Sequence, residues 1–343
     1  MTARRASGAT LKDVAREAGV SVTSAFRALN NRGELREESR GRIREVAERL
    51  HYVPSEPARA MVRGSTKTIG FLTNMRAPLG WSVVLAAMEA VFEPRGYDVL
   101  VASSDEEPER EARRLLTMVR KRVDGVLLLP TGNNLQQIVS LRERGIALVL
   151  LYYQVAGLDA DCVTFDFQGG ARRMVSYLVE LGHRRIGYAA SYRRPAEVAP
   201  HELGYREALE EAGLAVDEDL VVRATSHTSI QAGYDQGERL LNRPDRPSAV
   251  FAANDLQAIG VMEACRQLGL RVPKDVSVVG LGDMEFSRYL QVPLTTMSQD
   301  RYQAGVKAAE LLLARTADRM DAATQVVVLE PRLIVRESAA PPG

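Results

Sequence analysis

The chain has 343 residues, 45% hydrophobic and 26% charged, which is the composition of a globular protein and excludes a disordered or fibrous one. At about 150 residues per domain, this length predicts at least two packed units. Cys162 and Cys265 are the only cysteines and have no neighbouring ligand cluster, which excludes a disulfide framework and a cysteine-rich metal module. The longest apolar run, Ile146 to Tyr153, is far below the roughly 20 residues of a membrane helix. Charged residues follow Arg4 and Arg5 where an export signal would be apolar, so we expect a cytoplasmic protein without membrane contact.

Charge is unevenly distributed along the chain, although the net charge is only +1. Residues 1–65 hold 13 basic and 8 acidic side chains, a net of +5, and the remainder has a net of −4. Clustered Lys and Arg neutralise phosphates and release counterions, so this basic head indicates a polyanion partner. By charge alone, a solvated charged helix explains the pattern equally well.

Three short helices are predicted in the basic head. The segment Thr10 to Asp13 has the form of a capping box, so a helix begins there, and Gly19 ends it. Ser21 caps a second helix, Val22 to Leu29, and a third spans about Glu37 to His51. Two short helices joined by a glycine turn and backed by a third predict a helix-turn-helix. The alternative is another kind of three-helix bundle, which the polar second helix and the positive charge disfavour.

The second helix carries the candidate DNA contacts. Ser21 and Ser24 place hydroxyls at its start, where they suit phosphate oxygens. Val22 and Thr23 face out at its first turn toward thymine methyls or base edges, and Arg27 can form a fork onto guanine. The alternatives are that Val22 packs inward and that Arg27 contacts phosphate only.

The rest of the chain alternates short β-rich runs with helical stretches, which predicts parallel sheets in an α/β body. One series of runs precedes Gln168 and a second follows it. The expected strands are residues 68–73, 97–102, 125–129, 146–151, 185–189, 220–223, 249–252 and 276–279.

Enzyme motifs are absent from this sequence. Gly280-Leu281-Gly282 lacks the third glycine of a dinucleotide turn, with Glu285 in its place, which argues against a dehydrogenase. No Walker-type loop and no Gly-x-Ser-x-Gly elbow occur. The four histidines lack metal-ligand spacing. We therefore expect no catalytic residues, no metal and no cofactor.

Several short motifs together resemble the lactose-repressor (LacI/GalR) family. In the head they are Leu11-Lys12-Asp13-Val14-Ala15, Ala18-Gly19-Val20-Ser21 and Arg27-Ala28-Leu29-Asn30. Tyr52-Val53-Pro54 followed by Ala58-Arg59-Ala60-Met61 is similar to the family's hinge helix, and Thr68-Ile69-Gly70 to its entry into the effector domain. The similarity continues to about residue 335.

This resemblance implies a helix-turn-helix domain over residues 1–54, a hinge helix and linker over 55–66, and an effector-binding and dimerisation body over 67–343. The body would consist of two Rossmann-like halves of the periplasmic-binding-protein type, with a ligand cleft at the carboxyl ends of their strands. The protein would be a homodimeric repressor on a roughly palindromic double-stranded DNA operator. The alternative is a soluble sugar-binding protein that shares only the body fold; it would need export and no basic head.

In the hinge, the resemblance implies that Ala58 keeps two copies close and that Met61 wedges into the minor groove. Met61 stands where the family usually has Leu, and its size preserves the wedge.

In the head, Phe26 stands where the family usually has Ser, so a phosphate contact is lost or replaced by packing.

In the body, the resemblance implies effector contacts at Trp81, as an aromatic platform, and at Asn254. We expect Asp255 to cap the helix that follows Asn254. For Trp81 the alternative is core packing.

Three further positions depart from the neutral-sugar pattern of the family. His201 takes the place of a frequent sugar-binding Arg, and Gly282 that of a frequent Asp, with Asp283 beside it. Arg301 lies where an apolar ring is common. Because a guanidinium fits a carboxylate bidentately, these departures favour an anionic carbohydrate such as a sugar acid, with a sugar phosphate as runner-up. The pattern resembles the gluconate-type repressors of the family. The alternative is that Arg301 pairs with a surface acid.

Overall fold

The computed structural model describes residues 9–30, 35–53, 60, 64–74, 78–132, 134–191, 199–225, 229–316 and 323–343. The chain divides into two compact units. The first comprises residues 1–68 together with 122–124, and the second comprises residues 69–121 and 125–343.

The head contains three helices, as predicted: α1 (Leu11–Glu17), α2 (Val22–Leu29) and α3 (Glu37–Arg49). A reciprocal capping box starts α1, because the Thr10 hydroxyl accepts from the Asp13 amide and the Asp13 carboxylate accepts from the Thr10 amide. α3 ends two residues before its expected limit. One small apolar core joins the three helices; its buried members are Val14, Ala15, Ala18, Ala25, Ala28, Ile43, Val46 and Ala47.

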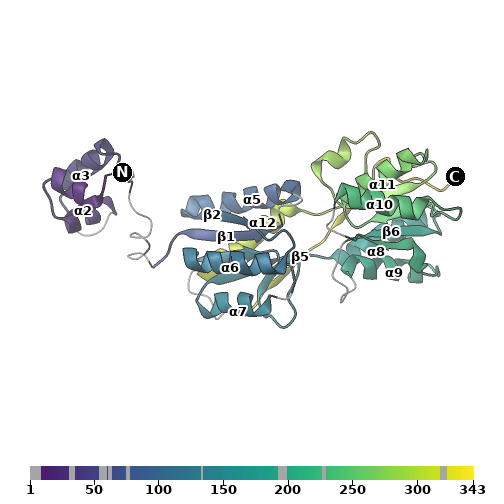
Figure 1. Cartoon of the computed structure of the whole chain (residues 1–343), viewed down its shortest axis with the longest axis horizontal. Helices are drawn as coiled ribbons and strands as arrows, with labels where there is room; N and C mark the ends of the chain where they lie inside the picture. The colour runs from purple at the N-terminus through teal and green to yellow at the C-terminus, as the bar shows by residue number, and fades with distance from the viewer. Residues whose placement is uncertain are drawn as a thin grey trace, which may run out of the picture. The chain divides into compact units, whose positions relative to one another are not determined.

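The body contains two six-stranded sheets, one in each lobe (Figure 1). The first sheet has the order β11-β5-β4-β3-β1-β2 and is parallel in the pairings that the structure describes. Its strands are β1 (Thr68–Thr73), β2 (Asp98–Ser103), β3 (Gly125–Leu128), β4 (Ala147–Leu151), β5 (Asp161–Phe165) and β11 (Val326–Leu329).

The second sheet has the order β12-β10-β9-β8-β6-β7. It is parallel except at one edge, where β12 runs antiparallel to β10. Its strands are β6 (Ile186–Ala190), β7 (Val221–Arg223), β8 (Ala249–Ala252), β9 (Ser277–Gly282), β10 (Thr295–Ser298) and β12 (Arg332–Ile334).

Helices cover the sheets in packed pairs. In the first lobe α5 (Pro78–Phe92) packs on α12 (Arg301–Thr316), and α6 (Pro108–Lys121) packs on α7 (Leu135–Glu143). In the second lobe α8 (Phe167–Glu180) packs on α9 (Pro200–Glu211), and α10 (Ile230–Leu241) packs on α11 (Asp255–Gln267). Gly204 permits the α8–α9 approach, because a Cβ there would overlap the Gln168 carbonyl oxygen.

The chain passes between the lobes three times: between β5 and α8, between β10 and α12, and between β11 and β12. Eight strands match their predicted ranges within a residue or two, except that β9 extends to Gly282. Four strands, β5, β10, β11 and β12, were not predicted. β10 reads Thr-Thr-Met-Ser, so it lacks the continuous apolar run of a central strand. β11 reads Val-Val-Val-Leu, and this apolar run was a strand signal that the prediction overlooked.

Candidate DNA-binding head and effector cleft

Side-chain caps fix the amino-terminal end of α2. Ser21 Oγ accepts a hydrogen bond from the Ser24 amide at 3.0 Å and lies 2.9 Å from Ser24 Oγ. The two hydroxyls therefore sit side by side at the end of the helix where free N–H groups and the helix dipole favour an anion.

The outer face of α2 presents the predicted base-reading residues. Val22 is 43% exposed, and Thr23 and Arg27 are exposed, whereas Ala25 and Ala28 are buried against the other two helices. Val22 therefore does not pack inward. Within the described part of the chain, Arg27 makes no ion pair, so its guanidinium is available to a ligand. Ala58 and Met61 lie outside the described residues.

The end of the linker is fixed to the turn that follows α6. The Asp124 carboxylate accepts hydrogen bonds from the Ser65 hydroxyl and from the amides of Thr66 (2.8 Å) and Lys67 (3.1 Å). The Thr66 hydroxyl donates to the Arg122 carbonyl oxygen at 2.7 Å. One carboxylate therefore sets where the linker enters β1.

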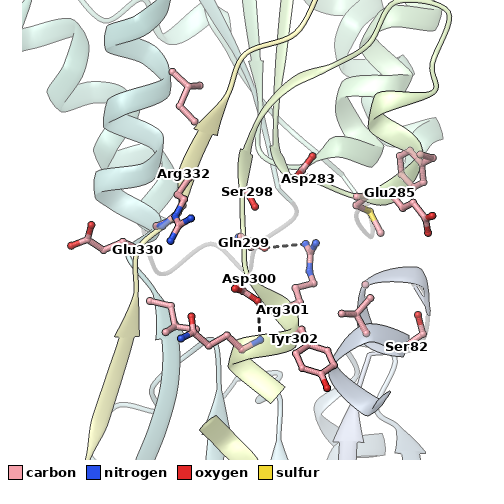
Figure 2. A pocket seen from close by; sticks show the side chains of 18 of the residues that line it. Ser82, Asp283, Glu285, Ser298, Gln299, Asp300, Arg301, Tyr302, Glu330 and Arg332 are labelled. Carbon is pink, nitrogen blue, oxygen red and sulfur yellow. Dashed lines mark hydrogen bonds between the residues drawn. The ribbon is translucent and has the colours of Figure 1, made fainter. Parts of the chain in front are cut away.

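In the body, Arg301 and Asp283 both line a cavity of about 970 Å³ beside the crossover strands (Figure 2). Arg301 is the first residue of α12, and its Nη1 donates to the Gly282 carbonyl oxygen at 2.7 Å. Its Nη2 donates to Gln299 Oε1 at 2.9 Å, the bond drawn in Figure 2. No carboxylate among the described residues forms an ion pair with Arg301. The described contacts therefore do not support the alternative in which Arg301 pairs with a surface acid.

Asp283 differs from Arg301 because its charge is already compensated. Its Oδ1 lies 2.5 Å from Nη2 of Arg336, and the two side chains are 15% and 14% exposed. Asp283 also has a φ of +48°, in the left-handed region. The acid beside Gly282 is therefore held in an ion pair at the rim of the cavity.

Asn254, and not Asp255, caps α11, so the expectation for Asp255 is wrong. Asn254 has an extended backbone and its Oδ1 accepts from the Gln257 amide at 3.0 Å. Asp255 is already the first helical residue, and its carboxylate accepts from residues 284, 287 and 296 instead of from an amide of α11.

The Asp255 carboxylate is fully buried and accepts from the Met284 amide (2.7 Å), the Ser287 hydroxyl (2.8 Å) and the Thr296 hydroxyl (2.6 Å). Burial raises the pKa of Asp255, and these hydrogen bonds and the charge of Arg301 oppose that rise. Asp255 thus ties the loop after β9 to β10, beneath Arg301.

The Asn254 amide belongs to a buried polar network. Its Nδ2 donates to Gln257 Oε1 at 2.5 Å, and Gln257 Nε2 donates to the Ala190 carbonyl oxygen (3.0 Å) and to Gln236 Oε1 (2.7 Å). Because Gln257 and Gln236 are buried, this network holds Asn254 in one orientation at the carboxyl ends of β6 and β8.

Trp81 and His201 lie at two ends of a series of ring contacts. Trp81 is half-buried, with its ring centroid 5.0 Å from that of Tyr152. The Tyr152 ring lies 6.1 Å from Phe167, which lies 4.8 Å from the buried His201. Aromatic side chains from both lobes therefore meet at the carboxyl ends of the strands, where parallel α/β sheets bind ligands.

Tyr152 is a site residue that the sequence did not lead us to predict; it directly follows β4 and has a φ of +69°. The residue is 8% exposed, and its hydroxyl makes no hydrogen bond of normal geometry within the described part of the chain. Burial raises the pKa of Tyr152, and the nearby Arg301 guanidinium opposes that rise. Its position one residue beyond a buried strand was the signal that could have identified it.

Among the residues that the structure describes, no group of His, Cys, Asp and Glu side chains is arranged to hold a metal ion. No described helix is long and apolar enough to cross a membrane.

The head and the cleft together define a class of protein, in which a helix-turn-helix is joined to a ligand-binding body of two α/β lobes. Residues 10–55 match the family model of bacterial regulatory proteins of the lacI family, and residues 175–339 match a periplasmic binding protein-like domain. The chain is 32% identical over 330 residues to the ribose operon repressor of Haemophilus influenzae, covering 96% of this chain and 98% of that one. It is 34% identical over 339 residues to the repressor PurR of Pectobacterium carotovorum, covering 97% of each chain.

Solved structures agree with these matches. The lac repressor dimer bound to operator and the anti-inducer ONPF has a TM-score of 0.83 and 25% identity, covering 97% of this chain and all of that one. The complex of the regulator CelR with cellobiose has a TM-score of 0.72 and 29% identity, covering 96% of this chain and 99% of that one. The chain belongs to the lacI family of bacterial regulatory proteins. It is a DNA-binding transcriptional repressor and not an enzyme, and the matched head rules out a binding protein that shares only the body fold.

Proposed function

We propose that this repressor controls genes for the use of an anionic carbohydrate and that its effector is a sugar acid of the gluconate or ketogluconate kind. The single observation that carries this proposal is the Arg301 guanidinium, held beside Gly282 by two neutral acceptors. A neutral-sugar site places a carboxylate where sugar hydroxyls need acceptors. Here position 282 has no side chain, and a guanidinium lies next to it.

The charges around Arg301 favour an anion. Asp283 is neutralised by Arg336, and Asp255 lies fully buried beneath the loop, where three donors satisfy its oxygens. Within the described part of the chain the guanidinium forms no ion pair, so a carboxylate ligand can bind it through charge-assisted hydrogen bonds. The buried Tyr152 hydroxyl adds a neutral donor nearby. Trp81 and Asn254 supply a ring face and an amide for the neutral part of a sugar, and His201 lines the far end of the ring series.

A thermal-shift screen tests this proposal. Gluconate and a ketogluconate are compared with ribose, cellobiose and glucose as neutral sugars, and with glucose phosphate for the runner-up. A ligand at a hundred times its Kd stabilises the folded body by about 2.7 kcal/mol. We expect stabilisation by the acids and none by the neutral sugars.

Arg301→Ala should lower the affinity for the acid at least tenfold, because a hydrogen bond to a charged group contributes about 1.5 to 3 kcal/mol. Arg332→Ala is the matched control, since Arg332 lines the same cavity and is exposed. Stabilisation by neutral sugars alone, or an Arg301→Ala variant that binds the acid normally, contradicts the proposal.

On DNA, we propose that residues 1–54 form the reading domain, 55–66 the hinge and 67–343 the body of a homodimer on a roughly palindromic operator. In each head Ser21 and Ser24 contact phosphates, and Val22, Thr23 and Arg27 read bases. Ala58 keeps the paired hinges close, and Met61 wedges a central base step. Two linked heads multiply affinity through effective concentration, so sedimentation that shows only monomers at operator-binding concentrations contradicts this arrangement.

A further inference from the structure

One face of α6 carries arginines that neither the head nor the effector cleft uses. Pro108, Glu111, Leu115 and Met118 are buried against the first lobe. The opposite face is a shallow, exposed hollow of about 480 Å³, lined by Arg110, Arg113, Arg114, Leu116, Thr117 and Arg120. We name these six residues the α6 basic face. Helix α6 itself is labelled on the first lobe in Figure 1.

Most of this positive charge is not compensated. Arg110 pairs with Asp105 at 2.5 Å. Within the described part of the chain, Arg113, Arg114 and Arg120 form no ion pair, and all three are exposed. Arg120 lies in the last turn, where a cation stabilises the helix dipole. Arg113 and Arg114 lie in the middle of the helix, so that effect does not account for them.

The α6 basic face adjoins the place where the linker from the DNA-binding head is fixed. α6 ends at Lys121, and the next three residues, 122–124, bind Ser65, Thr66 and Lys67 through the Asp124 carboxylate and the Arg122 carbonyl oxygen. Ser65 lies four positions after Met61, and an extended chain of four residue steps spans at most about 14 Å. A hinge that inserts at Met61 therefore keeps the end of α6 close to the DNA backbone.

We propose that the α6 basic face binds phosphates of the operator beside the hinge, as a sequence-independent contact made by the body. The negative phosphates of DNA complement the positive charge of this face. Long arginine side chains are suited to contacts with the DNA backbone, which carry no sequence information. The proposal rests on DNA binding by the head and on the hinge position. It makes the body a direct contributor to operator affinity.

The test is the salt dependence of operator binding, measured by fluorescence anisotropy from about 0.05 to about 0.2 M salt. Arg113→Gln with Arg114→Gln should lower the slope of log affinity against log salt by about 3.6, because each lost phosphate contact lowers it by about 0.9 and a dimer loses four contacts. The preference for operator over scrambled DNA should stay unchanged, because both lose the same contacts.

The matched control is Arg144→Gln with Arg239→Gln. It removes the same charge from exposed arginines outside α6 that form no ion pair in the described part of the chain. A slope equal to that of this control overturns the proposal. The proposal is also overturned if the double variant changes only the sedimentation of the free protein, because the face would then be an interface between protein chains. Operator binding by the unmodified protein at low salt reports separately on DNA binding by the head.

Discussion

Arg301 fills the space that a side chain at position 282 would occupy. A Cβ on Gly282 would lie 3.0 Å from Nη2 of Arg301, and Nη1 of Arg301 is hydrogen-bonded to the Gly282 carbonyl oxygen at 2.7 Å. Gly282 also has a φ of +138°, which residues with a Cβ rarely adopt. Because residue 282 has no side chain, the Arg301 guanidinium has room beside it. The guanidinium therefore places a positive charge where a side chain at position 282 would otherwise lie.

Gly282→Asp should abolish binding of the acidic effector, because the new carboxylate would pair with Arg301 and cancel its charge. Isothermal titration calorimetry with gluconate measures this loss. Gly282→Ala is the control, since it imposes the same backbone strain and leaves the positive charge in place. We expect the alanine variant to be less stable but to keep measurable affinity for the acid. Equal loss in both variants would assign the effect to strain.

Tyr152→Phe should weaken effector binding without weakening the ligand-free fold. The Tyr152 hydroxyl is buried and makes no hydrogen bond of normal geometry to the described residues, so its removal leaves no partner unsatisfied. If it donates to a carboxylate, its loss costs about 1.5 to 3 kcal/mol of binding, or roughly ten- to a hundredfold in Kd. Titration of the acid and ligand-free Tm values measure the two effects.

Tyr205→Phe is the control for that variant, because the Tyr205 hydroxyl is also buried but donates to the Ile186 carbonyl oxygen at 2.8 Å. It should lower the ligand-free stability by about 1 kcal/mol and leave effector affinity unchanged. A Tyr152→Phe variant that behaves in the same way would show that the hydroxyl serves the fold and not the ligand.

Local patterns predicted the head almost completely. The limits of α1 and α2 follow from capping rules, because each signal concerns residues that are close in sequence. Thr10 and Ser21 cap amides three residues further on, and a glycine follows α1. The central strands were also predictable, since a run such as Ala249–Ala252 is buried on both faces.

The site was less predictable because its contacts join distant segments. Asp255 was expected to cap a helix, but its side chain binds Ser287 and Thr296, which no local rule links to it. Tyr152 reads as the end of an apolar strand. Only the folded chain brings it near Arg301 and shows that its hydroxyl makes no hydrogen bond of normal geometry to the described residues.

Arg27→Ala should lower affinity for the cognate operator by about 1 to 3 kcal/mol and relax the preference at one base pair. Arg27 is exposed on the outer face of α2, so its removal leaves the head core intact. Binding to a set of operators with single base changes measures both effects. Arg16→Ala is the control, because Arg16 pairs with Asp13 on the surface of α1 at 2.7 Å. A uniform loss across all operators would reassign Arg27 to a phosphate.

His183 should make the body less stable as the pH falls. Its ring is 1% exposed, with Nδ1 2.8 Å from Ser248 Oγ and Nε2 2.9 Å from the Ala340 carbonyl oxygen. Burial lowers the pKa of His183, and the hydrogen bond to the Ala340 carbonyl oxygen opposes that shift. The unfolded chain therefore binds a proton below about pH 6.5, where the folded body does not.

This difference in proton binding fixes the sign of the pH dependence. The contribution of His183 to stability is complete above about pH 6.5 and is lost as the pH falls toward the lowered pKa of the folded state, by at most about 1.4 kcal/mol per pH unit. Urea unfolding at intervals between about pH 5 and pH 8 measures this loss. His183→Gln should be less stable than the unmodified protein at pH 8 and show a shallower decline toward pH 5. Ser277→Ala removes the hydroxyl that lies 3.2 Å from His183 Nε2 but keeps the buried imidazole, so it should retain the original slope. Parallel curves for the unmodified protein and His183→Gln would mean that another group titrates in this range.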